Sequence, residues 1–327
     1  MKTKSQFILI LTAFLSCTAF AQVERTTATA TEAKTKKEMM KPSVAYTATM
    51  DDIKSSLGMV PTMFKHYPQE ALPGAWEEMK SVQMNPNSAI SGKYKELIGL
   101  AVSAQIPCKY CVYFHKKMAM TQGASEREIN EAIAVAASTR KWSTVLYGNQ
   151  ISLDTLKKDV NQMISNAKAM AQKNTPTPMA MPAAEMMTAD AVLKDSQNLF
   201  GLTPVFLTDY HKPSVAGAWK ELRDFFNNPN TALPVKVKDL VSLAVSAQIP
   251  CDYCTHFDTE FAKFDGASNE EIKEAVIMAA MVRNWSTVLN GVAPDEKQFN
   301  REVDQLAANF KKKMNSMKMG GQASVTH

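Results

Sequence analysis

The sequence has little excess charge and no apolar stretch long enough to span a membrane. It contains 37 Lys and Arg residues against 32 Asp and Glu residues, a formal charge of +5. Without residues 1–21, which hold two lysines and no acid, the count is 35 against 32 and the charge is +3. Such a small excess gives no basis for nucleic-acid binding. The apolar run from Phe7 to Phe20 is shorter than the roughly 20 residues that a spanning helix needs.

That apolar run has the features of an export signal. Lys2 and Lys4 precede it, and Ala19-Phe20-Ala21 forms a small-x-small cleavage site. We therefore expect a signal peptide over residues 1–21, cut after Ala21, and a periplasmic or secreted mature chain. Lipidation at Cys17 is the less favoured alternative, because Phe14 stands where lipoprotein signals usually place Leu.

Cysteine is scarce, and its spacing is unusual. The chain has five cysteines, and cleavage would leave the pairs Cys108 with Cys111 and Cys251 with Cys254. An even count in an exported protein permits disulfides. A bond across two intervening residues closes too short a loop to stabilise a fold much. Redox chemistry is therefore favoured over permanent structural disulfides or a zinc ion shared by four thiolates.

The sequence repeats itself at a fixed distance of 143 residues. Leu100 to Cys108 reads LAVSAQIPC, and Leu243 to Cys251 reads the same. The same shift aligns Trp76 with Trp219, and it needs no gap. Such self-similarity indicates a tandem duplication.

The duplication divides the chain into six segments. Each repeat has the length of an ordinary domain, and we expect each to bury a core of its own. The linker contains Pro and Met residues without helical periodicity. The segments are a signal peptide over 1–21, a flexible segment over 22–43, repeat 1 over 44–172, a linker over 173–186, repeat 2 over 187–315 and a flexible tail over 316–327.

The periodicity within each repeat is helical, and no alternating strand pattern occurs. Residues 93–105 place Leu97, Ile98, Ala101 and Val102 on one apolar stripe. A second helix is expected to begin near Pro107 and to end at Gly123. Ser125 to Glu128 and Ser268 to Glu271 have the pattern of capping boxes that open further helices. The predicted fold class is all-α, with two similar helical domains.

The start of the predicted helix at Pro107 carries the chemistry. Backbone N–H groups in the first turn of a helix favour the thiolate form of a cysteine. Cys108 and Cys111 share one helix face, and His115 follows on that face four residues later. Glu96 lies twelve residues before Cys108, on the preceding helix.

Glu96, eleven intervening residues and then Cys108-Lys-Tyr-Cys111-Val-Tyr-Phe-His115 resemble the active-site signature of the AhpD-like alkylhydroperoxidases, a branch of the carboxymuconolactone decarboxylase family. Through the duplication the resemblance covers most of the mature chain. It implies that Cys111 is a peroxidatic thiolate, that Cys108 resolves its sulfenic acid, and that Glu96 and His115 relay protons. The family often has a His between its cysteines, where this chain has Tyr110.

The resemblance also implies partners. The substrate would be an alkyl hydroperoxide or hydrogen peroxide, with no metal or other cofactor. An exported chain needs an exported dithiol reductant, which we expect to be thioredoxin-like. Members of the family commonly form trimers or hexamers, so a homo-oligomer, a trimer by analogy, is expected.

The second repeat departs from this pattern. Cys251 and Cys254 are kept, but Asp239 replaces Glu96 and Asp258 replaces His115. An aspartate of ordinary pKa is a poor base for a thiol. We expect this pair to react slowly with peroxide, to relay electrons or to be structural. Two alternatives remain open for the whole chain, namely a general thiol–disulfide oxidoreductase of the cell envelope and a non-enzymatic module with structural disulfides.

Overall fold

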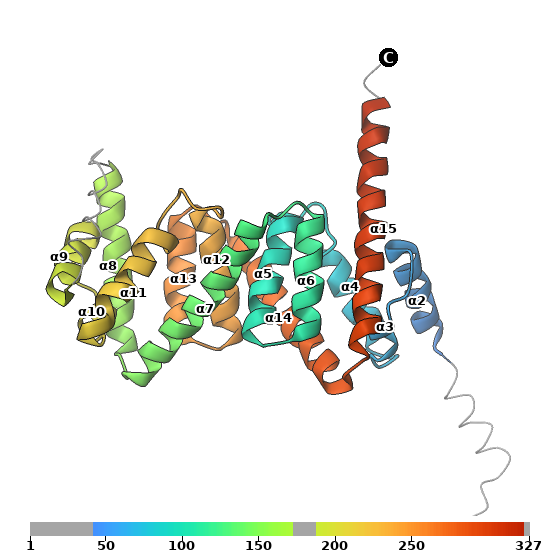
Figure 1. The fold of residues 1–327 in the computed structure, drawn as a ribbon, viewed down its shortest axis with the longest axis horizontal. Helices are drawn as coiled ribbons and strands as arrows, with labels where there is room; N and C mark the ends of the chain where they lie inside the picture. Colours follow the sequence, from blue (N-terminus) through green and yellow to red (C-terminus); the bar gives the residue numbers. More distant parts are fainter. Residues whose placement is uncertain (1–41, 173–187, 324–327) are drawn as a thin grey trace, which may run out of the picture. The chain divides into compact units, whose positions relative to one another are not determined.

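The computed structural model describes residues 42–172 and 188–323, with side chains up to residue 316. These ranges contain α-helices with two short turns of 3-10 and π type, and they contain no strand (Figure 1). This confirms the predicted all-α class. Among the helices in these ranges, none combines the length and the apolar character that crossing a membrane requires. The fold below is that of the compact unit that begins at Ser43.

The helices of the two repeats follow one another in the same order. The first repeat forms α2 (Val44–Leu57), α3 (Thr62–Lys65), α4 (Leu72–Val82), α5 (Gly92–Gln105), α6 (Lys109–Thr121), α7 (Glu126–Gly148) and α8 (Leu153–Gln172). The second forms α9 (Ala189–Phe200), α10 (Val205–Thr208), η1 (Lys212–Ser214), α11 (Val215–Glu221), η2 (Leu222–Phe226), α12 (Val235–Gln248), α13 (Asp252–Phe264), α14 (Asn269–Val292) and α15 (Glu296–Ala323).

The predicted helix boundaries are confirmed at the positions where the sequence carries capping signals. Ser125 caps α7 and Ser268 caps α14, and both capping boxes are complete. The apolar stripe of residues 93–105 lies on α5, where Leu97 and Ile98 are fully buried. The helix expected from Pro107 begins two residues later, at Lys109, because Cys108 rather than Pro107 occupies the capping position.

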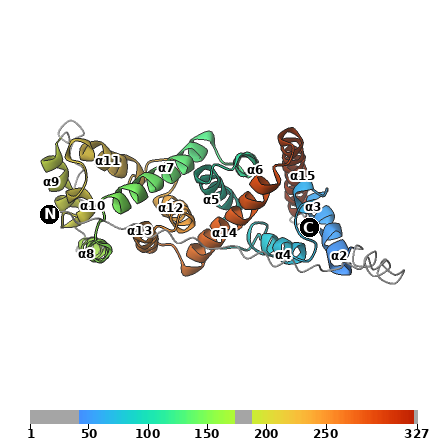
Figure 2. The same ribbon diagram turned by 90° about the horizontal axis from the view of Figure 1, so that it is seen from below.

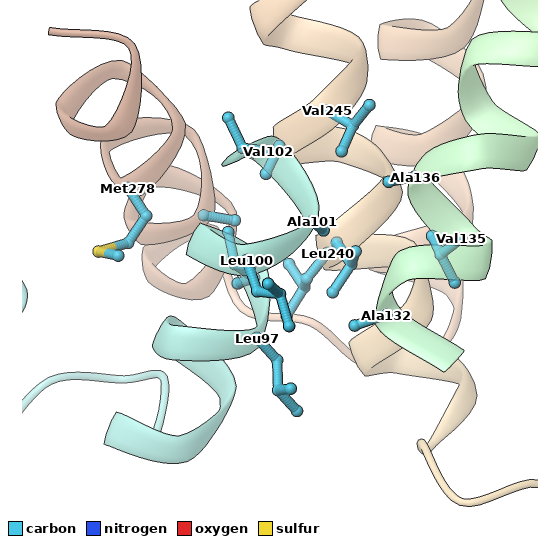
Figure 3. Packing of buried hydrophobic residues seen from close by; sticks show 14 of the residues in the cluster. Leu97, Leu100, Ala101, Val102, Ala132, Val135, Ala136, Leu240, Val245 and Met278 are labelled. Carbon is cyan, nitrogen blue, oxygen red and sulfur yellow. The ribbon is translucent and has the colours of Figure 1, made fainter. Parts of the chain in front are cut away.

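The central core is shared by the two repeats. Figure 3 shows Leu97, Leu100 and Ala101 of α5 beside residues of α7, α12 and α14, among them Ala132 and Leu240. The prediction that each repeat buries its own core is therefore wrong for this cluster. The shared sequence LAVSAQIPC explains it, because its small and apolar residues make α5 and α12 apolar on most of their surface. Each of these helices consequently packs against the other as well as against its own repeat.

The last helix of each repeat also packs on the other repeat. Helix α15 contacts α2, α3 and α6 of the first repeat, whereas α8 contacts α9, α10 and α13 of the second (Figures 1 and 2). Long helices α7 and α14 lead to these positions. Each cysteine-bearing helix is thus covered by the carboxyl-terminal half of the other repeat.

Equivalent carboxylates fasten the repeats together. Glu274 of α14 accepts hydrogen bonds from the backbone N–H groups of Ala89 and Ile90, both at 2.8 Å. Glu131 of α7 accepts the equivalent bonds from residues 232 and 233, also at 2.8 Å. Because the bonds recur at the offset of 143, the duplication extends to individual contacts between the repeats.

The predicted segment boundaries meet the structure in different ways. Helix α15 continues through residues 316–323, where a flexible tail was expected. The helix persists because no proline interrupts this stretch, and Gly320-Gly321 lies only in its last turn. The signal peptide, nearly all of the 22–43 segment, the 173–186 linker and residues 324–327 lie outside the described residues.

Candidate active site

The first cysteine pair lies at the start of α6. Cys108 is the capping residue, and the N–H group of Cys111 donates a hydrogen bond to its sulfur at 3.3 Å. The two residues form a disulfide with their Cα atoms 5.3 Å apart. Cys108 is fully buried and Cys111 is 4% exposed. Because a backbone donor faces the Cys108 sulfur, negative charge on that sulfur is stabilised in the reduced pair.

His115 and Glu96 form a buried pair one turn further along α6. His115 Nδ1 lies 2.7 Å from Glu96 Oε2, and the side chains of both residues are less than a tenth exposed. The side-chain amide of Gln83 donates to the other oxygen of Glu96 at 2.9 Å. Since Nδ1 is held by the carboxylate, Nε2 is the ring nitrogen left for proton exchange with another group.

A buried lysine fixes the segment that carries Gln83. Lys95 Nζ donates to the backbone oxygens of Val82 at 2.6 Å and Asn85 at 3.1 Å. Burial lowers the pKa of Lys95 from its usual value. The end of α4 is thus tied to α5, which also supplies Glu96.

Gly99 provides the space for the imidazole. A Cβ atom at position 99 would lie 2.5 Å from Nδ1 and Cε1 of His115. No carbon atom approaches a ring so closely without displacing it. A glycine one turn after Glu96 is therefore a condition for the His115–Glu96 pair.

Cys111, His115 and Glu96 line one cavity of about 700 Å³. The wall includes residues of both repeats, because Met281, Trp285 and Phe299 of the second repeat face the helices of the first. The volume lies within the range of small-molecule binding sites. Cys108 does not line the cavity.

The second cysteine pair has the same local geometry and different neighbours. Cys251 caps α13, and the N–H group of Cys254 donates to its sulfur at 3.2 Å. These residues also form a disulfide. Asp258 stands in the place of His115, and Ser242 stands in the place of Gly99. The Ser242 hydroxyl lies 2.7 Å from the Thr139 hydroxyl.

Burial changes the acid chemistry of this second site. It raises the pKa of Asp258 to about 7, although the Ser242 and Ser246 hydroxyls lower it. Burial and then the neighbouring Asp265 raise the pKa of Asp239 well above its usual value. The expectation of an aspartate with ordinary pKa is therefore wrong. Asp258 can exchange a proton near neutral pH.

The second cavity is small, about 80 Å³. Phe206 and Phe261 occupy positions equivalent to Met63 and Met118 of the first cavity, and all four line their respective sites. Rigid rings replace adaptable thioether chains there. His256, the one histidine near the second pair in sequence, does not line this cavity.

The structure brings together every residue that the sequence proposed for the first site. Glu96, Cys111 and His115 meet at one cavity, with Cys108 directly behind Cys111. Sequence reasoning missed Gln83, Gly99 and the wall from the second repeat, including Trp285. The alignment of the repeats carries a signal for two of these residues, because Ser242 replaces Gly99 and Phe226 replaces Gln83 in the second repeat.

The two cysteine pairs lie in different core clusters, so they do not share a metal ion. In the described ranges, no group of three or more His, Cys, Asp or Glu side chains is placed to hold a metal ion.

The fold and site define a helical protein with two tandem cysteine pairs, one of them beside a buried histidine–glutamate pair.

Comparison with known proteins identifies the family. The sequence profile of the carboxymuconolactone decarboxylase family matches residues 70–151 and again residues 213–296. The chain therefore belongs to the carboxymuconolactone decarboxylase family, with two copies in tandem.

Two individual proteins are similar to parts of the chain. "Uncharacterized protein 4 in cox locus" of Paracoccus denitrificans is 34% identical over 64 residues, which are 20% of this chain and 58% of that protein. The chain thus matches less than two thirds of that relative. A solved structure from Burkholderia xenovorans, assigned as a gamma-carboxymuconolactone decarboxylase subunit, is 16% identical with a TM-score of 0.41. The matched region covers 82% of this chain and 98% of the chain in that structure.

Proposed function

We propose that this protein is an exported thiol peroxidase that works through the first cysteine pair. The observation that carries the proposal is the meeting of Cys111, His115 and Glu96 at one cavity, with His115 held at 2.7 Å from the carboxylate. A thiolate next to a proton donor in a partly dry pocket is what cleavage of a peroxide bond needs.

In the proposed reaction, the Cys111 thiolate attacks the terminal oxygen of a hydroperoxide. The S–O bond forms, the O–O bond breaks, and the leaving alkoxide takes a proton through His115. Cys111 is oxidised to a sulfenic acid and the peroxide is reduced to an alcohol. Cys108 then loses its thiol proton and attacks the Cys111 sulfur; the S–S bond forms, the S–O bond breaks, and the leaving hydroxide takes up a proton and departs as water. A dithiol reductant returns both sulfurs to the thiol state.

Each residue has a separate contribution in this scheme. Glu96 orients the imidazole through Nδ1 and stabilises it when it carries a proton, which makes Glu96 a positioning residue. The N–H group of Cys111 stabilises the thiolate of Cys108. Cys111 faces the cavity where the peroxide binds, whereas Cys108 remains enclosed.

Rapid mixing of the fully reduced protein with cumene hydroperoxide, with thiols counted per chain, tests the proposal. We expect fast loss of two thiols that is absent in Cys111→Ser and retained in Cys254→Ser. Reaction no faster than that of free cysteine in all three proteins would exclude a peroxidase.

We further propose that the second pair reacts more slowly or relays electrons. Its cavity holds about 80 Å³, and Asp258, when ionised, places a negative charge near Cys254 that disfavours the thiolate. Combining Asp239→Glu, Ser242→Gly and Asp258→His in the Cys111→Ser background gives the second site the glutamate, glycine and histidine of the first. We expect that variant to regain peroxide-dependent thiol loss. No gain would show that the smaller cavity or the aromatic wall limits the second site.

A general thiol–disulfide oxidoreductase uses the same cysteines but needs contact with a protein disulfide. The His115–Glu96 pair favours the peroxidase, because protonating a leaving alkoxide is the task of a positioned imidazole. The proposed reductant is an exported thioredoxin-like dithiol protein. A reductant that approaches the start of α6 would also contact residues of the second repeat. There Lys109 pairs with Glu296, and the Tyr110 hydroxyl donates a hydrogen bond to the backbone oxygen of Pro294.

A further inference from the structure

The first cavity is larger and more apolar than hydrogen peroxide requires. Its volume is about 700 Å³, whereas the second cavity, built around an equivalent cysteine, holds about 80 Å³. Seven methionines line the first cavity, and none lines the second: Met63, Met79, Met84, Met118, Met278, Met281 and Met314. Unbranched thioether chains adapt to flexible apolar ligands.

The cavity is elongated along one face of α15. Phe299, Leu306, Phe310 and Lys313 all line it, at spacings that place them on the same side of the helix. Phe299 lies at the cysteine end, because its ring is 5.2 Å from that of Tyr110, the neighbour of Cys111. Lys313 follows fourteen residues later, about 21 Å further along the helix axis. One acyl layer of a bilayer is about 15 Å thick, so a lipid-length chain fits between these ends.

The charges along this wall are distributed unevenly. Glu96, at the reacting end, is engaged by His115 and Gln83. Lys313 is exposed, and it is the one basic Lys or Arg side chain among the lining residues. The equivalent position in the first repeat is Met170, which does not line the second cavity. The cavity therefore has an apolar interior with one cation at its distant end.

We propose that this cavity binds a free long-chain fatty acid hydroperoxide, with its carboxylate at Lys313 and its acyl chain along α15 toward Cys111. The assignment of a hydroperoxide substrate rests on the proposed function, whereas binding of the acyl chain does not. Reaction follows the balance given above: a hydroperoxide on the half of the chain distant from the carboxylate is reduced to an alcohol while Cys108 and Cys111 are oxidised to the disulfide.

Binding of unreactive fatty acids to the full mature chain tests the acyl site directly. Titration calorimetry with oleate is expected to show one site, with affinity falling about fourfold for each methylene removed as the chain is shortened to decanoate. Lys313→Gln should weaken oleate binding about two- to fivefold, since an exposed ion pair is screened by solvent. Lys312→Gln is the matched control and should leave affinity unchanged, because Lys312 does not line the cavity.

A second variant is needed because the change in affinity expected for Lys313→Gln is small. Phe310→Asp places a charge in the half-buried wall of α15 and should weaken binding at least tenfold, with helix content by circular dichroism unchanged. Absence of oleate binding, or equal binding by the wild type and Phe310→Asp, would overturn the proposal. So would binding to phosphatidylglycerol vesicles in the absence of binding to free oleate.

Kinetics separate this inference from the proposed function. With linoleic acid hydroperoxide we expect kcat/KM to exceed that for hydrogen peroxide at least tenfold, with oleate a competitive inhibitor. Equal kcat/KM for both peroxides, without inhibition by oleate, would leave the peroxidase standing and overturn the substrate assignment. Oleate binding without reduction of any peroxide would support the acyl site and exclude the peroxidase.

Discussion

At the scale of single residues, one missing side chain decides the chemistry of each site. Gly99 leaves room for the His115 ring, and Ser242 fills the same space in the other repeat, where Asp258 replaces the histidine. A functional histidine at this position requires both the imidazole and the glycine opposite it. The two changes are therefore coupled by volume.

Gly99→Ser should disable the first site without unfolding the protein. The new Cβ would lie 2.5 Å from the imidazole, so the ring must leave its position beside Glu96. Loss of a positioned proton donor lowers rates by about 100-fold, which stopped-flow thiol consumption would measure. Gly74→Ser is the control, because a Cβ at that position would have no atom within 4 Å apart from its chain neighbours and the backbone of its own helix. Equal rates for Gly99→Ser and the wild type would remove His115 from the mechanism.

Asp258 gives the stability of the protein a defined pH dependence. Its folded-state pKa is about 7, above the 3.8 of the ordinary group, because burial disfavours the charged form. The folded state therefore holds the proton more tightly. Its stabilising contribution is complete below about pH 4 and is lost as pH rises toward 7. The difference between the two pKa values corresponds to at most about 4 kcal/mol in the free energy of unfolding.

Asp258→Asn should accordingly raise Tm more at pH 8 than at pH 5. Differential scanning calorimetry at both pH values measures the difference, with exposed Asp51→Asn as the control. Part of the dependence will remain, because Asp239 and Asp265 also have raised pKa values beside Lys238. A Tm change that is the same at both pH values would contradict the assignment.

At the scale of elements, helices α7 and α14 join the repeats through their carboxylates. Glu131 and Glu274 each accept two backbone hydrogen bonds from a loop of the other repeat, all at 2.8 Å. These bonds satisfy loop N–H groups next to the buried residues Ile90 and Leu233. The two loops are held by the same chemistry because they descend from one sequence.

Removal of either carboxylate should destabilise the fold strongly. A hydrogen bond to a charged group contributes about 1.5–3 kcal/mol, so Glu131→Ala and Glu274→Ala should each lower the free energy of unfolding by about 3 kcal/mol. Urea denaturation measures the change. Glu126→Ala, on the exposed first turn of α7, should cost well under 1 kcal/mol and serves as the control. Losses similar to that of the control would show that the loops do not depend on these bonds.

Much at this scale could be predicted from the sequence, because the signals are local. Ser125 with Glu128, and the apolar stripe around Leu97, depend on neighbours within one or two turns. Glu96 and His115 could be predicted as partners through their resemblance to a known signature. The cavity could not, since Trp285 and Phe299 approach Cys111 from more than 170 positions away. No periodicity within one repeat indicates contacts of that range.

At the scale of the whole molecule, neither repeat is complete alone. The first cysteine pair lies in a cluster with Trp285, Leu289 and Val303 of the second repeat. The second pair lies with Trp142, Leu146 and Val160 of the first. Apolar surface on this scale does not remain exposed on a stable monomer.

Residues 44–172 and 187–315, produced separately, should therefore not give folded monomers. Each half is expected to remain unfolded or to pair with another half, whereas mixing the two should restore the helical signal and a 1:1 complex. Circular dichroism with light scattering measures both. A folded, monomeric half with a cooperative melting transition would contradict the shared core.

Linking the two copies in one chain has a consequence for how their sites can change. In a dimer of identical subunits, every substitution appears twice, so a change that suits one pocket is imposed on the other. In this chain the methionines of the first cavity and the phenylalanines of the second are encoded separately. Residues of the opposite repeat nevertheless form part of the wall of each cavity. A substitution in α14 or α15 thus modifies the pocket of the repeat that does not contain it. One site can therefore become specialised for its substrate, and the other can lose its activity, through independent substitutions.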